Sequence, residues 1–171
     1  MKLSKVIALS ALCTAMSATL LCIGAYFLTL SYSCIFLASV VVLLPLAKET
    51  YKGAILTVIA SALLSFLIAS FSFETALPYL LFFGFHPIVS KYLEEKKLNR
   101  FLAYLIKNLW FVGSMLCCYF LTSMFIVENE TLKKYMIYII IIGGSIFFII
   151  YDVLFKFFQK QMNVISKRLK I

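Results

Sequence analysis

Charged residues are scarce in this chain, and histidine is nearly missing. Of its 171 residues, 13% are charged, 64% are hydrophobic and one is a histidine. A soluble domain of average composition is closer to half apolar and a quarter charged. The shortage of charge therefore excludes an ordinary soluble fold. The mean hydropathy of +1.04 is instead typical of a membrane protein.

The sequence also lacks the motifs of common catalytic and nucleotide-binding sites. It has no G-x-S-x-G, no H-E-x-x-H, no Walker-type phosphate loop and no C-x-x-C. A single histidine leaves no His-rich metal site, and the five cysteines show no ligand spacing. They fall within apolar runs and are expected to be packing residues. We therefore expect no enzymatic activity, no cofactor and no metal.

Long apolar runs separated by short polar turns fill the whole chain. Because a spanning helix needs about 20 apolar residues, a chain of this length holds about six. We predict an all-α polytopic membrane protein, with six transmembrane helices in one integral membrane domain, 1–171. The expected spans are 6–30, 34–47, 53–71, 76–90, 101–127 and 135–158. The basic tail 159–171 is expected to continue as a helix along the membrane surface.

The fourth expected span is interrupted by Gly84 and Pro87. These residues are tolerated at membrane depth only where neighbouring groups satisfy the freed backbone. We therefore predict a kink or break at 85–87. The first expected span starts after two lysines, as a signal peptide would. Its apolar run is too long for a signal peptide and no A-x-A site with a polar sequence after it follows, so we read it as a span.

Basic residues predict which side of the membrane each turn occupies. The densest internal charge cluster surrounds Lys96, between the fourth and fifth spans, and the positive-inside bias places such a loop in the cytoplasm. Both termini then also lie in the cytoplasm. This topology puts thirteen of the sixteen Lys and Arg residues on that side, with Lys156 counted in the basic tail. It leaves Lys133 and Lys134 outside and Lys107 within a span. The charge thus indicates a multi-pass protein of the cell membrane in contact with lipid, and we expect no nucleic-acid partner.

Apart from Lys156, which we count with the basic tail, three ionisable residues fall within the expected spans: His86, Lys107 and Asp152. Such groups are costly in lipid and mark functional or paired positions. Lys107 lies six residues into its span, about 9 Å deep at 1.5 Å per residue, and the other two lie at a similar depth on the cytoplasmic side. We predict a buried Lys107–Asp152 ion pair. Snorkelling of Lys107 to the interface and a proton relay through His86 and Asp152 are the alternatives.

Tyrosines and hydroxyl residues gather around the three expected outer turns. One interpretation is an interfacial aromatic belt, and the other is a pocket for a small, partly apolar molecule. For the pocket, the sequence offers six candidate ligand contacts. These are Tyr32, Glu74, Tyr79, Tyr119, Asn129 and Tyr138.

Small residues crowd the first half of the first expected span. Ala11, Ala15 and Thr19 form one line with a spacing of four, and a second line starts at Ser10. Such lines allow close helix approach, because lipid provides no hydrophobic drive and packing must supply the attraction. The partner helix can belong to this chain or to another subunit, and the sequence leaves both possibilities open.

Two segments carry a resemblance to a known family. Lys2 and Lys5 precede 8–18, an A-x-x-x-A segment that resembles the first span of the substrate-binding S components of energy-coupling factor transporters. The segment 78–87 resembles one in uncharacterised small membrane proteins of Gram-positive anaerobes related to that group. Six spans with cytoplasmic termini also match that architecture over the whole chain.

The resemblance implies a function in micronutrient uptake. An S component binds a vitamin or similar solute near its outer face, beneath the first loop. It then topples in the membrane when coupled to a transmembrane T subunit and two ATPases. The resemblance places the docking face at Ala11 and Ala15, and we add the basic loop around Lys96. One departure is that the expected first outer turn, 31–33, is very short.

Two other classes compete with this interpretation. The chain could be a non-transporting scaffold, assembly factor or accessory subunit, with polar outer residues scattered around the helices and no pocket. It could also be an independent small carrier, although the inverted repeats typical of many carriers are not visible. No residue in the sequence selects among vitamins, metals or lipids as the solute.

Overall fold

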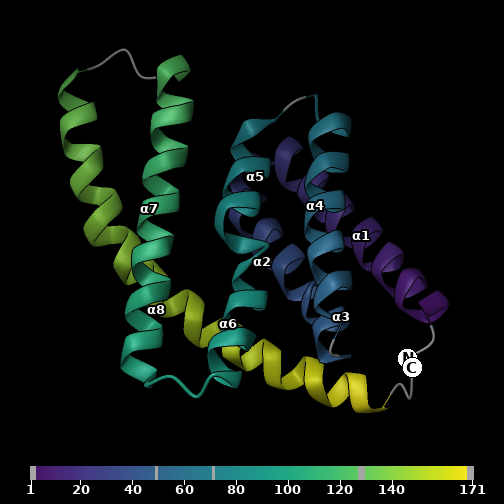
Figure 1. The fold of residues 1–171 in the computed structure, drawn as a ribbon. Helices are drawn as coiled ribbons and strands as arrows, with labels where there is room; N and C mark the ends of the chain where they lie inside the picture. The colour runs from purple at the N-terminus through teal and green to yellow at the C-terminus, as the bar shows by residue number, and fades with distance from the viewer. Residues whose placement is uncertain (1–2, 49, 71, 127–129, 169–171) are drawn as a thin grey trace.

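The computed structural model describes residues 3–48, 50–70, 72–126 and 130–168. The described residues are almost entirely helical and contain no strand, which confirms the predicted all-α polytopic membrane fold (Figure 1). The α-helices are α1 (Leu3–Tyr26), α2 (Ser31–Val41), α3 (Leu43–Ala47), α4 (Tyr51–Ile68), α5 (Phe73–Pro78), α6 (His86–Glu95), α7 (Arg100–Ile126) and α8 (Glu130–Arg168). The 3₁₀ turn η1 (Leu28–Leu30) precedes α2, and the π-helical turn η2 (Tyr79–Phe83) follows α5.

Five helical segments within the described residues are long and apolar enough to cross a membrane. They are Ser4–Tyr26, Leu28–Ala47, Tyr51–Ile68, Arg100–Thr122 and Tyr135–Val164. These segments correspond to the first, second, third, fifth and sixth expected spans. The fourth expected span corresponds to α5, η2 and α6 in succession, which are not among these five segments. Consecutive crossings run in opposite directions, so the α4–α5 and α7–α8 links share one end of the molecule and the α6–α7 link lies at the other (Figure 1). We call these the outer end and the basic end, after the predicted topology.

The fourth crossing is broken where Gly84 and Pro87 predicted a kink. The Gly84 N–H donates to the Tyr79 carbonyl at 2.7 Å, an i to i+5 bond that widens the turn. Two residues later α6 begins at His86, with Pro87 in its first turn, where proline costs no helical hydrogen bond. A Cβ on Gly84 would lie 2.6 Å from Val58 Cγ1, so glycine allows this segment to pack directly on α4.

The first outer turn differs from the prediction. The link is 27–30, and 31–33, expected to be the turn, form the start of α2. The reason is a close approach of the two helices at Gly24 of α1. A Cβ there would lie 3.0 Å from Cys34 Cβ and 3.3 Å from the Ser31 carbonyl oxygen. The third outer loop is also shorter than expected, because α8 already begins at Glu130.

Helix α1 packs between α2 and α4 through its small residues. Ser10, Thr14 and Ala18 are buried against these neighbours, and a Cβ on Gly53 of α4 would lie 2.6 Å from Ser10 Oγ. One of the two small-residue lines therefore serves contacts within the chain. The other line, which includes Ala11, is exposed on the opposite side of the helix.

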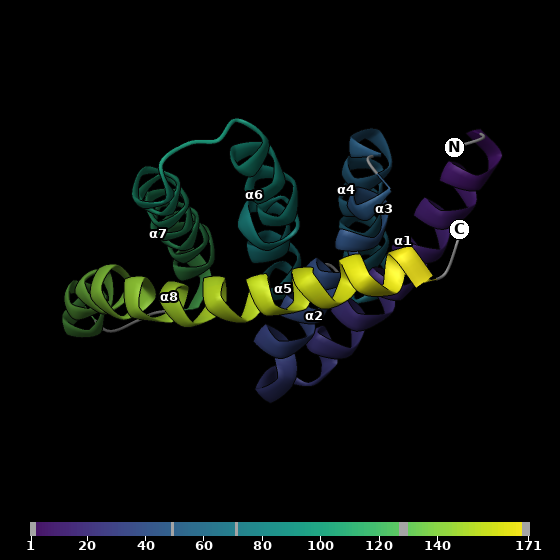
Figure 2. The same cartoon turned by 90° about the horizontal axis from the view of Figure 1, so that it is seen from below.

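Helices α7 and α8 form an antiparallel pair beside the other crossings (Figure 1). Helix α8 is 39 residues long. Its second half runs beneath α6 and α3 at the basic end, as the view from below shows (Figure 2). Lys48 Nζ, after α3, donates to the Ser166 carbonyl at 3.0 Å and ties α8 down. The predicted helical tail is therefore present as a continuation of the last crossing.

Candidate functional site

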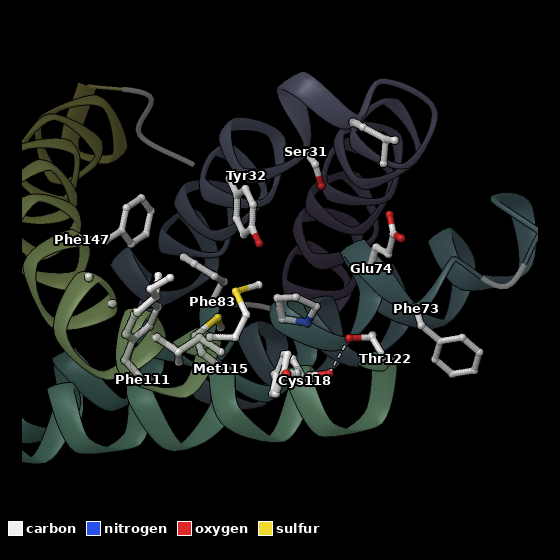
Figure 3. Close-up of a pocket in the computed structure, with 18 residues that line it drawn as sticks. Ser31, Tyr32, Phe73, Glu74, Phe83, Phe111, Met115, Cys118, Thr122 and Phe147 are labelled. Atoms are coloured by element: carbon white, nitrogen blue, oxygen red, sulfur yellow. Dashed lines mark hydrogen bonds between the residues drawn. The ribbon is translucent and has the colours of Figure 1, made fainter. Parts of the chain in front are cut away.

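A cavity of about 650 Å³ lies at the outer end of the molecule. One wall is built by η1, α2, α5 and η2, and the other by the α7–α8 pair. Figure 3 shows Ser31 and Tyr32 projecting from α2 toward Met115 and Cys118 on α7. The cavity thus lies between the α7–α8 pair and the earlier elements η1, α2, α5 and η2. Its volume is that of a pocket for one small organic molecule.

The floor of the cavity is apolar and aromatic. Phe83 comes from η2, and Phe111 and Met115 lie one turn apart on α7. The Phe111 ring stacks on Phe147 of α8, with a centroid distance of 6.0 Å and an interplanar angle of 24°. Gly143 of α8 also lines the cavity and leaves space at this wall. A solute that reaches this floor must therefore present an apolar or aromatic surface.

The rim of the cavity carries its polar groups. Ser31 and Tyr32 lie on one side, Glu74 on a second, and Tyr119 and Thr122 on α7. The Thr122 hydroxyl is occupied, since it donates to the Cys118 carbonyl at 2.8 Å (Figure 3). The Tyr119 hydroxyl is buried and has no hydrogen-bond partner among the described residues. Such a group is costly to leave unsatisfied. Because protein atoms enclose the hydroxyl, a solute or water can become its partner only after neighbouring side chains move.

Glu74 is the carboxylate of this rim. It lies in the first turn of α5, is exposed, and has no Lys, Arg or His within 4 Å in the part of the chain that the structure describes. A carboxylate without a cationic partner among the described side chains can accept hydrogen bonds from a solute or pair with its positive charge. Polar recognition in this cavity therefore centres on Glu74 and Tyr119.

The structure brings three of the six candidate contacts together. Tyr32, Glu74 and Tyr119 line the cavity. Tyr79 does not, because its side chain is fully buried in the core and its hydroxyl lies 3.0 Å from Ser61 Oγ. Tyr138 is exposed and does not line the cavity. Asn129 lies outside the described residues.

The floor residues were not among the sequence candidates. A signal for them exists on α7, where Phe111, Met115, Cys118 and Thr122 follow the helical spacing of one face. In the stretch 135–151 of α8, almost every residue is apolar around the whole helix, so no periodicity identifies Phe147. Only the pairing of the two helices reveals which side faces the cavity.

A second cluster of polar side chains lies toward the basic end. The predicted ion pair is present: Lys107 Nζ of α7 contacts Asp152 Oδ1 of α8, and both residues are buried. Lys156 Nζ lies 2.6 Å from the other Asp152 oxygen, Oδ2. One carboxylate thus serves two ammonium groups, and α7 is tied to α8 at membrane depth.

His86 joins the same cluster from α6. Its Nδ1 lies 3.2 Å from the Tyr151 hydroxyl, and its Nε2 lies 3.4 Å from Ser90 Oγ and 3.7 Å from Asp152 Oδ1. The ring is fully buried. The cluster therefore satisfies each ionisable group that the membrane would penalise and joins three helices. Proton transfer through it stays a prediction.

The candidate docking residues are all at the surface. Ala11 and Ala15 are exposed on α1, and Lys96 is exposed just after α6. Lys96 Nζ lies 5.7 Å from the centre of the Tyr92 ring. No second helix of the described chain covers the Ala11 line, so this face is open to lipid or to another subunit.

The fold defines an all-α polytopic membrane protein with a solute-sized cavity near one membrane face. The chain matches no protein-family model, and neither the curated proteins nor the solved structures gave a match. What the protein does must therefore be argued from the cavity and from the exposed faces.

Proposed function

We propose that this chain is the substrate-binding membrane subunit of a micronutrient uptake transporter of the energy-coupling factor kind. The observation that carries the proposal is the outer cavity of about 650 Å³, in which an apolar floor is combined with Glu74 and Tyr119. Binding sites for small molecules have this composition: mostly apolar walls with a few polar groups that fix the orientation.

The lining specifies the chemistry of the solute. Phe83, Phe111 and Phe147 suit an aromatic or branched aliphatic body. Glu74 suits a hydrogen-bond donor or a positive charge at one end of that body. The free Tyr119 hydroxyl suits a second polar group. The best candidates are thus small heterocyclic or amine-bearing micronutrients, and anionic solutes are disfavoured.

Two further features of S components, a small-residue docking face on the first span and a first outer loop above the substrate, can be compared with this structure. The A-x-x-x-A face, represented by Ala11 and Ala15, is exposed and available for a T subunit. The first outer link is short, at four residues, yet Leu28 from this link lines the cavity. A solute in the cavity would therefore touch the link beneath which S components bind their substrates.

Solute binding is tested with the full-length protein in detergent. A panel of water-soluble vitamins and other micronutrients is screened by thermal shift, and the hits are titrated by isothermal calorimetry. We expect Glu74→Gln and Tyr119→Phe each to weaken binding by about tenfold or more, since the first removes the negative charge and the second removes the hydroxyl group. Tyr138→Phe and Glu95→Gln are matched controls outside the cavity and should bind as the parent does.

Transport is tested by purification from the native membrane. Co-purification with a T subunit and two ATPases supports the proposal. A solute that enters proteoliposomes without any ATPase would instead indicate an independent carrier. If no member of the panel binds while other membrane proteins co-purify, the chain is a scaffold or accessory subunit and the proposal is wrong.

A further inference from the structure

A second cavity, of about 520 Å³, lies at the basic end between α6, α7 and α8. Two helix faces with the same spacing oppose each other across it. The α7 face consists of Arg100, Ala103, Tyr104 and Lys107, and the α8 face of Lys156, Gln159, Lys160 and Asn163. In both faces the members are separated by three, four and seven positions, so each set forms one continuous stripe. The cavity belongs neither to the outer site nor to the predicted docking face on α1.

The walls of this cavity carry more positive than negative charge. Four of the lining residues are cationic: Arg100, Lys107, Lys156 and Lys160. Two carboxylates are near them, Glu94 in the wall and Asp152 behind it. The single charge of Asp152 is shared by Lys107 and Lys156. The Glu94 carboxylate accepts a hydrogen bond from Gln159 Nε2 at 3.1 Å. Four cations thus face two carboxylates, which leaves two positive charges uncompensated.

Arg100 and Lys160 are the two cations of this wall that have no carboxylate partner of their own among the described residues. In the described ranges of the chain, no carboxylate lies within 4 Å of either side chain. Both are exposed, whereas Lys107 is buried, so positive charge extends from the surface of the cavity to its inner wall. Such an arrangement raises the local concentration of anions.

We propose that this cavity binds a phosphate group. A guanidinium donates two parallel hydrogen bonds to phosphate oxygens, and an ammonium adds a point charge, which together suit a tetrahedral dianion or a phosphodiester. Tyr104 and Asn163 add neutral donors on opposite walls. The phosphate can be the headgroup of an anionic phospholipid or free phosphate in solution. Both sources share the same recognition chemistry.

The apolar residues beside the cations indicate whether the phosphate belongs to a lipid or is free in solution. Leu93, Leu98 and Ala103 line the same cavity next to Arg100. The site also lies where α7 begins, at the level at which basic pockets between transmembrane helices meet lipid headgroups on the cytoplasmic side. A phospholipid could place its phosphate against the cations and its glycerol against the leucines.

The experiment uses the full-length protein in a non-ionic detergent. In the first arm, mixed micelles contain phosphatidylglycerol or, separately, phosphatidylcholine, and bound lipid is counted by native mass spectrometry. In the second arm, inorganic phosphate is titrated with a thermal-shift readout. Retention of phosphatidylglycerol but not of phosphatidylcholine assigns the site to a lipid headgroup. Saturable stabilisation by inorganic phosphate alone assigns it to soluble phosphate.

Two double variants separate the cavity from general surface charge. Arg100→Gln/Lys160→Gln removes both unpaired cations, and Lys52→Gln/Lys97→Gln removes two exposed cations that do not line the cavity. Both change the net charge equally. We expect the first to weaken binding about tenfold or more, and the second less than about twofold. Circular dichroism checks that both variants fold. The proposal would be overturned if both double variants weakened binding equally. It would also be overturned if the protein neither retained phosphatidylglycerol in preference to phosphatidylcholine nor was stabilised by inorganic phosphate.

Discussion

Lys107 and Asp152 form a buried ion pair although 45 positions separate them in sequence. The pair joins α7 to α8, and Asp152 also holds Lys156 one turn further along its own helix. Asp152 is therefore the shared partner of two cations, whereas each lysine has only this carboxylate in the described chain. This asymmetry decides how the two members of the pair respond to substitution.

Asp152→Asn should destabilise the protein more than Lys107→Met does. Loss of the carboxylate leaves two ammonium groups without a counter-charge, at a cost of about 3–5 kcal/mol for breaking a buried pair. Loss of Lys107 leaves Asp152 bonded to Lys156 and should cost less. The free energy of unfolding is measured by titration with SDS, followed by circular dichroism. Lys160→Met, which lies on the same helix outside the pair, is the control. Equal effects of the first two variants would show that Lys156 does not compensate.

Gly84→Ala should destabilise the broken fourth crossing. The added Cβ would lie 2.6 Å from Val58 Cγ1, and overpacking of this kind costs about 1–3 kcal/mol. Val58→Ala in the same chain should restore only part of the loss, because the new Cβ would still lie 3.0 Å from the Tyr79 carbonyl oxygen. Gly113→Ala is the matched control, because its Cβ would meet nothing within 4 Å. The melting temperature in detergent measures the stability of each of these variants. A Gly84→Ala protein as stable as the parent would mean that α4 and η2 separate easily.

Gly143→Leu should fill the outer cavity without unfolding the protein. Gly143 lines the cavity, and its nearest side-chain atom to a new Cβ is Ile139 Cγ2 at 3.9 Å. A larger side chain therefore has room, but it occupies the space of a solute. We expect solute binding to fall by about tenfold or more, since a clash costs more than a lost methylene. Gly113→Leu is the control for leucine on the same helix pair. Undiminished binding would place the solute elsewhere.

Ala11→Leu/Ala15→Leu should block assembly with a T subunit and leave solute binding intact. Both alanines are exposed, so leucine meets no neighbour within the chain but prevents close approach of another helix. Gly113→Leu/Cys117→Leu is the matched control, since these two small, exposed residues have the same spacing on α7. Assembly is measured by co-purification. Loss of the complex in the control alone would move the docking face to α7.

Glu74 and Lys96 should report opposite sides of the membrane. Both placements follow from the positive-inside topology, in which the basic link after α6 is cytoplasmic and the start of α5 lies on the outer side. Alkaline phosphatase fused after Glu74 should be active, and the same enzyme fused after Lys96 should be inactive. A fluorescent protein that matures only in the cytoplasm should give the reverse pattern. If both positions gave the same result with each reporter, Glu74 and Lys96 would lie on the same side of the membrane, and the model of six crossings would be wrong.

The all-α membrane fold and the approximate positions of the long apolar helices were predictable from the sequence, because hydropathy and short polar turns leave few alternatives in a lipid solvent. The helix ends were less so, since α2 begins at Ser31 and α8 at Glu130. Gly84 and Pro87 located the break, and Lys107 and Asp152 located the ion pair, since lone charges in lipid need partners. Lys156 was missed as a third member. Its spacing of four from Asp152 would have identified it.

The orientation of side chains around each helix was harder to predict. Tyr79 was expected at the outer cavity but lies in the core, because the π-helical turn that begins there shifts the phase of the residues around it. Tyr138 lies on a helix that is apolar on all sides, so its direction depends on how α8 packs on α7. A π-helical turn does not show in the hydrophobic periodicity of a sequence. The way in which two uniformly apolar helices pair does not show there either.

Helix α8 is continuous from the outer cavity, at Gly143, to the underside of the molecule, at Ser166. At 1.5 Å per residue, its 39 residues measure about 58 Å. Figure 1 shows that the helix changes direction along this path. Its upper stretch lines the outer cavity and its lower stretch contacts α3, so a solute that displaces the upper stretch acts on a helix that is also anchored at the opposite membrane face.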